Sequence, residues 1–169
     1  AVRHEFRLEQ LGRWPVGPRA GRDDGLGQKV TEPTHFLNVD LEIYSKSNLE
    51  PLVSALGKKV LVLFLGRVKR KYGARLEVAK HTKNADSTIR AFCTLIESLP
   101  RAERRLWNEA KVRDFSIGVQ AGGEPSASDF AIAVETLQAT VDVGARIVLT
   151  IYAPEVVRQP SRKRAATVR

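Results

Sequence analysis

Between residues 36 and 154 the apolar residues of this chain change their spacing from a period of two to a period of about 3.6 and back again. A period of two is typical of a strand with one buried face, and the longer period is typical of a helix with one buried side. A chain that alternates between the two patterns packs helices on a sheet. We therefore expect one α+β domain over residues 36–154, with a mixed β-sheet of about six strands and three or four helices packed on it.

Three stretches in the first half of this domain predict strands. In residues 36–44, Val39, Leu41 and Ile43 alternate with polar residues, which predicts a strand with one buried face. Residues 60–68 form a nearly continuous apolar run, which predicts a central strand covered on both faces. Residues 67–75 predict a hairpin with its turn near 71–73, where Gly73 can adopt a positive φ.

Helices are expected at three places before residue 112. A short helix is expected between Asn48 and Gly57. Asn48 would be its N-cap, and Gly57 would end it in a left-handed conformation. After Asp86, the spacing of five apolar residues predicts a longer helix with one apolar side, formed by Ile89, Phe92, Cys93, Ile96 and Leu99. This spacing places Cys93 in the core. Residues 101–111 predict a more polar helix with Leu106 and Trp107 turned inward.

The end of the domain allows two structures. Residues 115–119 predict a strand, and strict alternation from Phe130 to Val134 favours a second, antiparallel strand. A helix starting near Phe130 is the alternative, because Ser126 and Asp129 have the spacing of a capping box. A helix over 135–143 with Leu137 and Val141 inward and a final strand over 146–152 complete the domain.

The two ends of the chain differ from this domain in composition. Residues 1–35 are rich in glycine and proline and lack apolar periodicity, which predicts a flexible N-terminal arm. Residues 155–169 predict a basic disordered tail that contains Arg162, Lys163 and Arg164. No apolar run is long enough to span a membrane and no signal peptide is visible, so we expect a cytoplasmic protein without a membrane partner.

Four segments of the chain resemble a family of small bacterial α/β domains of unknown function. They are residues 40–43, 91–100, 114–122 and 144–152, and the likeness covers residues 36–154. The resemblance implies a stand-alone bacterial domain. It implies no activity and no catalytic residues.

Metal, cofactor and thiol chemistry have little support in the sequence. The histidines His4, His35 and His81 are scattered and none has the spacing of a metal ligand pair, so we expect no metal site. The glycine pair at Gly25 and Gly27 does not join a strand to a helix, so no nucleotide cofactor is expected. Cys93 is the single cysteine and is expected to be structural rather than a nucleophile paired with His81.

Carboxylates offer a possible enzymatic site. Asp40 and Glu42 share one strand face, and Asp114 is a possible third member. Two carboxylates can act as acid and base if one of them is desolvated. A carboxylate-dependent hydrolase is therefore one hypothesis, although alternating charges are usually the solvated face of a strand.

The predicted hairpin concentrates positive charge in a chain whose net charge is +9. We predict that it forms a partner-binding site made of Arg67, Lys69, Arg70, Lys71, Tyr72 and Arg75, with Glu77 as the only acidic residue nearby. Such a ribbon can dock an acidic protein, can follow a phosphate backbone while Tyr72 stacks on a base, or can simply protect an edge strand from aggregation.

We therefore expect a non-enzymatic interaction module that binds an acidic protein partner through this basic hairpin. The first alternative is sequence-independent nucleic-acid binding by the hairpin and the C-terminal tail. The second alternative is the carboxylate-dependent hydrolase. The sequence gives no indication of the oligomeric state.

Overall fold

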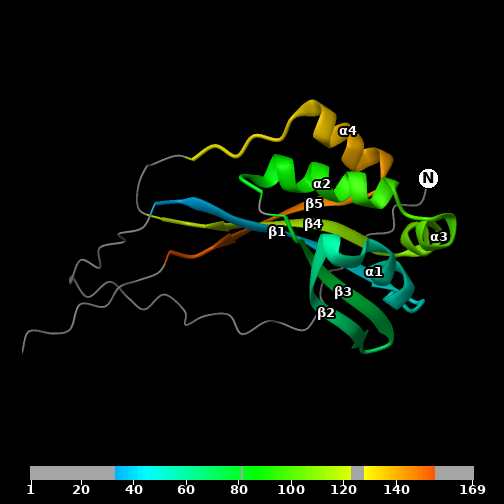
Figure 1. Ribbon diagram of the computed structural model, residues 1–169. Coiled ribbons are helices and arrows are strands. Elements are labelled where there is room, and N and C mark those ends of the chain that lie inside the picture. The colour runs from blue at the N-terminus through cyan, green and yellow to red at the C-terminus, as the bar shows by residue number, and fades with distance from the viewer. Residues whose placement is uncertain (1–32, 81, 123–127, 155–169) are drawn as a thin grey trace, which may run out of the picture.

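The computed structural model describes residues 33–80, 82–122 and 128–154. These residues form an α+β fold in which helices cover one face of a mixed sheet (Figure 1). The strands are β1 (His35–Ser45), β2 (Val60–Val68), β3 (Lys71–Val78), β4 (Val112–Gln120) and β5 (Arg146–Tyr152). The helices are α1 (Glu50–Leu56), α2 (Ala85–Glu97), α3 (Arg101–Glu109) and α4 (Val134–Asp142), with a 3₁₀ turn η1 (Gly57–Lys59) after α1.

The sheet has the order β2-β3-β1-β4-β5, so β2 and β5 are its two edge strands within the described part of the chain. All neighbouring pairs are antiparallel except β4 and β5, which are parallel. A parallel pair needs a connection that returns the chain to the starting end of the sheet, and α4 lies in this crossover.

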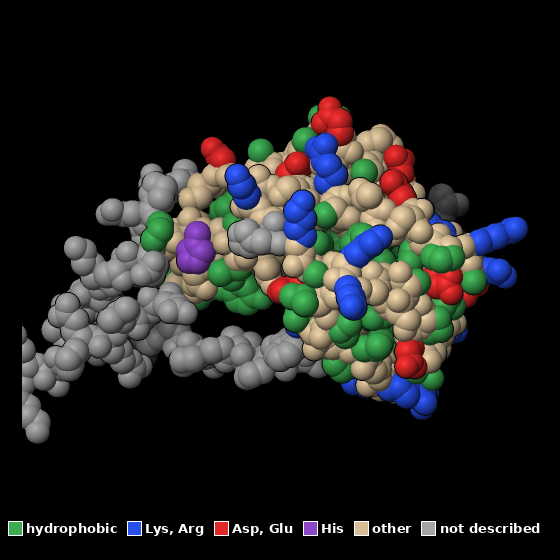
Figure 2. All heavy atoms as spheres, in the orientation of Figure 1, with side chains coloured by type: hydrophobic (Ala, Val, Ile, Leu, Met, Phe, Trp, Pro, Cys, Tyr) green, Lys and Arg blue, Asp and Glu red, His purple; other side chains and the backbone are tan. Residues whose placement is uncertain are grey.

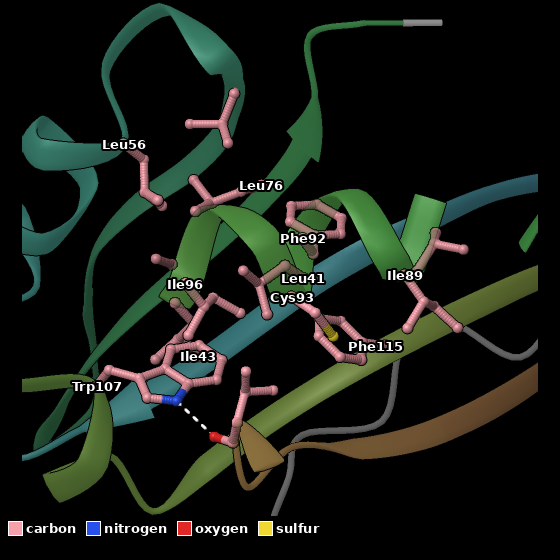
Figure 3. Close-up of a cluster of buried hydrophobic side chains, with 14 of the residues drawn as sticks. Leu41, Ile43, Leu56, Leu76, Ile89, Phe92, Cys93, Ile96, Trp107 and Phe115 are labelled. Atoms are coloured by element: carbon pink, nitrogen blue, oxygen red, sulfur yellow. Dashed lines mark hydrogen bonds between the residues drawn. The ribbon is translucent and has the colours of Figure 1, made fainter. Parts of the chain in front are cut away.

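The core lies between the helices and one face of the sheet. Every second residue of β1 from Val39 to Ser45 is buried, as the alternation predicts. The stripe on α2 is buried as well, and Phe92 stacks on Phe115 of β4 with ring centroids 5.8 Å apart. Figure 3 shows side chains from α1, α2, α3 and three strands meeting in this one cluster.

Several local predictions are confirmed. Gly57 and Gly144 have positive φ values of 58° and 68° just after α1 and α4, a backbone conformation that favours glycine. The ψ of Gly57 is −140°, so this residue does not form the predicted left-handed stop and leads into η1 instead. Trp107 on α3 is fully buried and its Nε1–H donates to the Val143 carbonyl oxygen at 2.7 Å, the dashed line in Figure 3. The final strand coincides with residues 146–152.

The predicted strand from Phe130 to Val134 is wrong, and the described residues form five strands rather than six. Residues 128–133 have no regular secondary structure, and α4 begins at Val134. An antiparallel strand there would compete with β5 for the side of β4 that β5 occupies. The backbone N–H of Ala133 instead donates to Asp86 Oδ1 at 2.9 Å, which ties the start of α4 to α2.

The inward orientation predicted for Leu137 and Val141 is also wrong. These side chains are 43% and 69% exposed, whereas Thr136 and Thr140 are buried on another side of α4. The threonine hydroxyls can be buried because each forms a hydrogen bond: Arg90 donates to Thr136 Oγ1, and Thr140 Oγ1 donates to the Thr136 carbonyl oxygen.

Candidate interaction surface

The β2–β3 hairpin is built differently from the sequence prediction. Its turn consists of Lys69 and Arg70, and Lys69 has a φ of 57°. Gly73 lies inside β3 opposite Tyr44, where an added Cβ would meet the Tyr44 ring at 3.0 Å. Gly73 therefore permits a close approach between two strands and does not form the turn.

Strand β2 is an edge strand, which corrects the prediction of a central strand covered on both faces. β3 lies between β2 and β1, so β2 pairs on one side only within the described residues. Five consecutive large apolar side chains of β2 are 37–52% exposed; they are Leu61, Val62, Leu63, Phe64 and Leu65. An apolar run of this length has the same composition in a buried strand and in an exposed edge, so its position could not be read from the sequence.

Positive charge lies at both ends of this exposed strand. Lys58 and Lys59 precede β2, while Arg67 and the residues of the turn lie at its other end. No acidic residue occurs between positions 51 and 76. Figure 2 shows Lys and Arg side chains at the lower end of the molecule, where the β2–β3 turn lies, beside a patch of hydrophobic side chains. We call β2, its flanking Lys58 and Lys59, and the turn with Lys71 the basic edge.

Four of the six predicted site residues lie together at the end of the hairpin. Arg67, Lys69, Arg70 and Lys71 are all exposed there. The guanidinium of Arg67 lies 5.3 Å from the centroid of the Tyr72 ring, a cation–π contact. Tyr72 is also partly buried against the core. Because Arg67 lies over its ring and the core packs against it, Tyr72 is not an open platform on which a base could stack.

Arg75 belongs to a different environment. Its side chain points to the sheet face that none of the described helices covers, where Nη2 lies 2.9 Å from Glu42 Oε1 and Nε lies 3.8 Å from Asp40 Oδ2. Glu77 is therefore not the only acidic residue near the hairpin, because β1 supplies two more. The charge of Arg75 is balanced within the sheet.

The sheet face opposite the described helices brings the three predicted carboxylates together. Glu42 lies directly opposite Asp114 across the β1–β4 pair, and Asp40 lies two residues from Glu42 on the same face. Asp114 accepts two hydrogen bonds from Arg146 of β5, at 2.8 Å from Nε and 2.7 Å from Nη2. Glu42 and Asp114 are thus each held by an arginine.

Asp40 is the perturbed member of this group. Burial raises the pKa of its carboxyl to about 6, and the nearby Glu77 carboxylate adds to the increase. Asn38 Nδ2 donates to Asp40 Oδ1 at 2.9 Å and to Glu77 Oε1 at 2.7 Å, so it links the two acids. A raised carboxyl pKa is useful in acid–base catalysis, but such perturbation also occurs in purely structural networks.

The surroundings of these carboxylates give little support to hydrolysis. The shallow depression beside them is lined by Asn38, Glu77, Lys80 and Thr82, among others, and its lining does not include Asp40, Glu42 or Asp114. Among the described residues, no group of three or more His, Cys, Asp or Glu side chains is placed to hold a metal ion.

The thiol of Cys93 is in the core, as predicted. It is 2% exposed, and burial raises its pKa to about 11, so the thiol is protonated near neutral pH. His81, its hypothetical partner, lies outside the described residues, as do His4 and the basic tail. A protonated, buried thiol is a poor nucleophile, which argues against the cysteine mechanism.

Comparison with protein-family models, with curated proteins and with solved structures found no match to this chain. The resemblance to small bacterial domains therefore stays a prediction. Within residues 33–80, 82–122 and 128–154, no helix has the length and apolar character needed to cross a bilayer.

Proposed function

We propose that this chain is a non-enzymatic interaction module and that its basic edge binds an acidic protein partner. One observation carries this proposal: an edge strand with five half-exposed large apolar side chains has basic residues at both ends and no acidic residue among them. An open strand edge can accept an added strand through backbone hydrogen bonds, while side chains provide specificity.

The basic residues that flank β2 determine which kind of strand can pair with this edge. If two copies of β2 paired antiparallel about its midpoint at Phe64, Lys59 would lie opposite Lys69 and Lys58 opposite Arg70. Like charges directly opposite each other destabilise a strand pair. The basic edge therefore disfavours a second copy of itself and favours a foreign strand with acidic ends.

The spacing of the basic residues gives the length of that segment. Lys59, the last residue of η1, and Arg67 of β2 are eight residues apart, which corresponds to about 26 Å in a fully extended segment. A partner strand would carry its acidic residues about the same distance apart, with apolar or β-branched residues between them.

Nucleic-acid binding is the weaker alternative. Stacking would require an accessible aromatic face, and Arg67 already lies over Tyr72. Arg75 is already paired with Glu42 and Asp40. The hydrolase hypothesis is weaker still, because arginines neutralise Glu42 and Asp114.

A defined peptide tests the proposal on the full chain. The probe has two Glu residues at each end and seven alternating Val and Thr residues between them, and its binding is followed by fluorescence anisotropy. We expect binding that weakens with added salt and that weakens at least about tenfold when Arg70 and Lys71 are both changed to Glu. The matched control changes Arg101 and Arg105, two exposed arginines of α3, to Glu and should bind like the unmodified chain.

Two further probes decide between the hypotheses. A peptide with Lys in place of each Glu should not bind, and equal binding of the two peptides would refute the proposal. Single-stranded and double-stranded oligonucleotides are titrated at the same low salt concentration. Binding of either oligonucleotide more tightly than the acidic peptide would replace the proposal with the nucleic-acid alternative.

A further inference from the structure

The opposite edge of the molecule carries a second exposed apolar surface that the basic edge does not explain. Leu149 and Ile151 of β5 are 57% and 65% exposed. Val134, Leu137 and Val141 of α4 are exposed as well. We call these five residues the β5–α4 surface. Exposed apolar side chains that gather on one part of a protein surface are typical of protein–protein interaction sites.

The strand register shows which way the β5 side chains point. Leu149 lies opposite Ile117 of β4, and Ile151 lies opposite Val119. Ile117 and Val119 are buried in the core, so Leu149 and Ile151 are on the same, helix-covered side of the sheet. They remain exposed because β5 is the last strand described on this edge and α4 does not cover them.

The three exposed residues of α4 form one stripe. Val134, Leu137 and Val141 are spaced three and four residues apart, which places them on one side of the helix. The core-facing side is a different one, formed by Thr136 and Thr140. Because α4 contacts β5 and is joined to it through Gly144 and Ala145, the stripe and the exposed β5 side chains belong to the same end of the molecule.

The charges on β5 are compatible with self-pairing, in contrast to those on β2. Arg146 is the one charged residue of β5, and it is held by Asp114 through two hydrogen bonds. In an antiparallel pair of β5 strands centred on Leu149, Arg146 would lie opposite Tyr152. No like charges would oppose each other there.

We propose that two copies of this chain associate through antiparallel pairing of their β5 strands, with the β5–α4 surfaces packed across the new junction. A twofold axis through Leu149 makes the contact isologous, because each copy presents the same surface to the other. The two sheets would become one continuous sheet, and the outer edge of each β5, which pairs with no other described strand, would gain backbone hydrogen bonds. This inference does not depend on the proposed function of the basic edge.

Sedimentation equilibrium of the full chain tests the association. Between about 1 and about 200 µM we expect a concentration-dependent shift from monomer to dimer. The variant Leu149→Lys/Ile151→Lys should remain monomeric over the same range, because the charge at position 149 would face its own copy across the axis and the charge at position 151 would be buried opposite Ile147. Both side chains are more than half exposed, so the variant should fold.

A matched control changes the other edge in the same way. Leu61→Lys/Leu63→Lys alters two β2 side chains that are 52% and 50% exposed, and it should dimerise like the unmodified chain. If the β5 variant unfolds, Val134→Lys/Val141→Lys on α4 replaces it, since these side chains are 76% and 69% exposed and should likewise weaken the dimer at least about tenfold.

Three results would overturn the inference: a monomer at every concentration, a dimer unaffected by the β5 and α4 variants, or a dimer lost in the β2 control. The peptide-binding experiment reads out the basic edge separately. A monomer that binds the acidic peptide would therefore refute the dimer alone, and a dimer that does not bind the peptide would refute the proposed function alone.

Discussion

At the scale of single residues, Asp40 shows how a partly buried carboxyl in a charged network makes the stability of the fold depend on pH. Its side chain is 18% exposed, and Asn38 links it to Glu77. Burial and the neighbouring Glu77 carboxylate raise the pKa of Asp40 from its usual 3.8 to about 6. A carboxyl with a raised pKa binds its proton more tightly in the folded state than in the unfolded state. Protonated Asp40 therefore stabilises the fold below about pH 4, and this contribution is lost as the pH rises through about 6.

Changing Asp40 to Asn should remove this pH dependence. Asn is neutral and can still accept the hydrogen bond from Asn38, so the variant should gain stability over the unmodified chain as the pH rises from about 4 to about 7.5. The pKa change sets a ceiling of about 3 kcal/mol on the gain. Urea unfolding at both pH values measures it. If the free energies of unfolding of the variant and the unmodified chain differ by the same amount at both pH values, the raised pKa of Asp40 is contradicted.

At the scale of elements, much of the fold follows from local patterns. The alternation in residues 36–44 and the stripe on α2 fix both the type of element and its buried side, and both predictions are confirmed. The errors concern contacts that are distant in sequence. The run in residues 60–68 became an edge because β3 lies between it and β1. Residues 130–133 formed no strand because β5 takes the place beside β4.

The candidate site was predictable to a similar degree. Its basic residues were visible in the sequence, and four of them do lie together at the end of the hairpin. The pairing of Arg75 with Glu42 was not visible, because it depends on the register between β1 and β3. The exposure of β2 depends on strand order, which periodicity does not encode.

The orientation of α4 can be tested by comparing two substitutions. Trp107→Phe removes the hydrogen bond to the Val143 carbonyl oxygen and should lower the free energy of unfolding by about 2–4 kcal/mol. Leu137→Ala should cost less than about 1 kcal/mol, because this side chain is 43% exposed. Urea unfolding followed by circular dichroism, at a protein concentration low enough to keep the chain monomeric, measures both. A larger loss for Leu137→Ala than for Trp107→Phe would mean that α4 turns Leu137 inward.

At the scale of the whole molecule, the two edge strands of the described sheet differ in character. β2 is flanked by lysines and arginines that would repel each other in a self-paired edge, whereas β5 carries one charged residue that is already paired. We propose that the first edge accepts an acidic foreign strand and that the second edge accepts its own copy. Both surfaces can be occupied at once because they lie at opposite ends of the strand order.

Amide hydrogen exchange on the full chain tests this claim most directly. The Tyr152 carbonyl accepts a bond from the Ala121 N–H beside β4, so alternation points the amides of Leu149 and Ile151 toward the outer edge of β5. Raising the protein concentration should slow exchange at Leu149 and Ile151 and leave β2 unchanged. Adding the Glu-ended peptide should slow exchange in β2 and leave Leu149 and Ile151 unchanged. Slowing of β2 by concentration alone, or no slowing of either edge under either condition, would contradict the account.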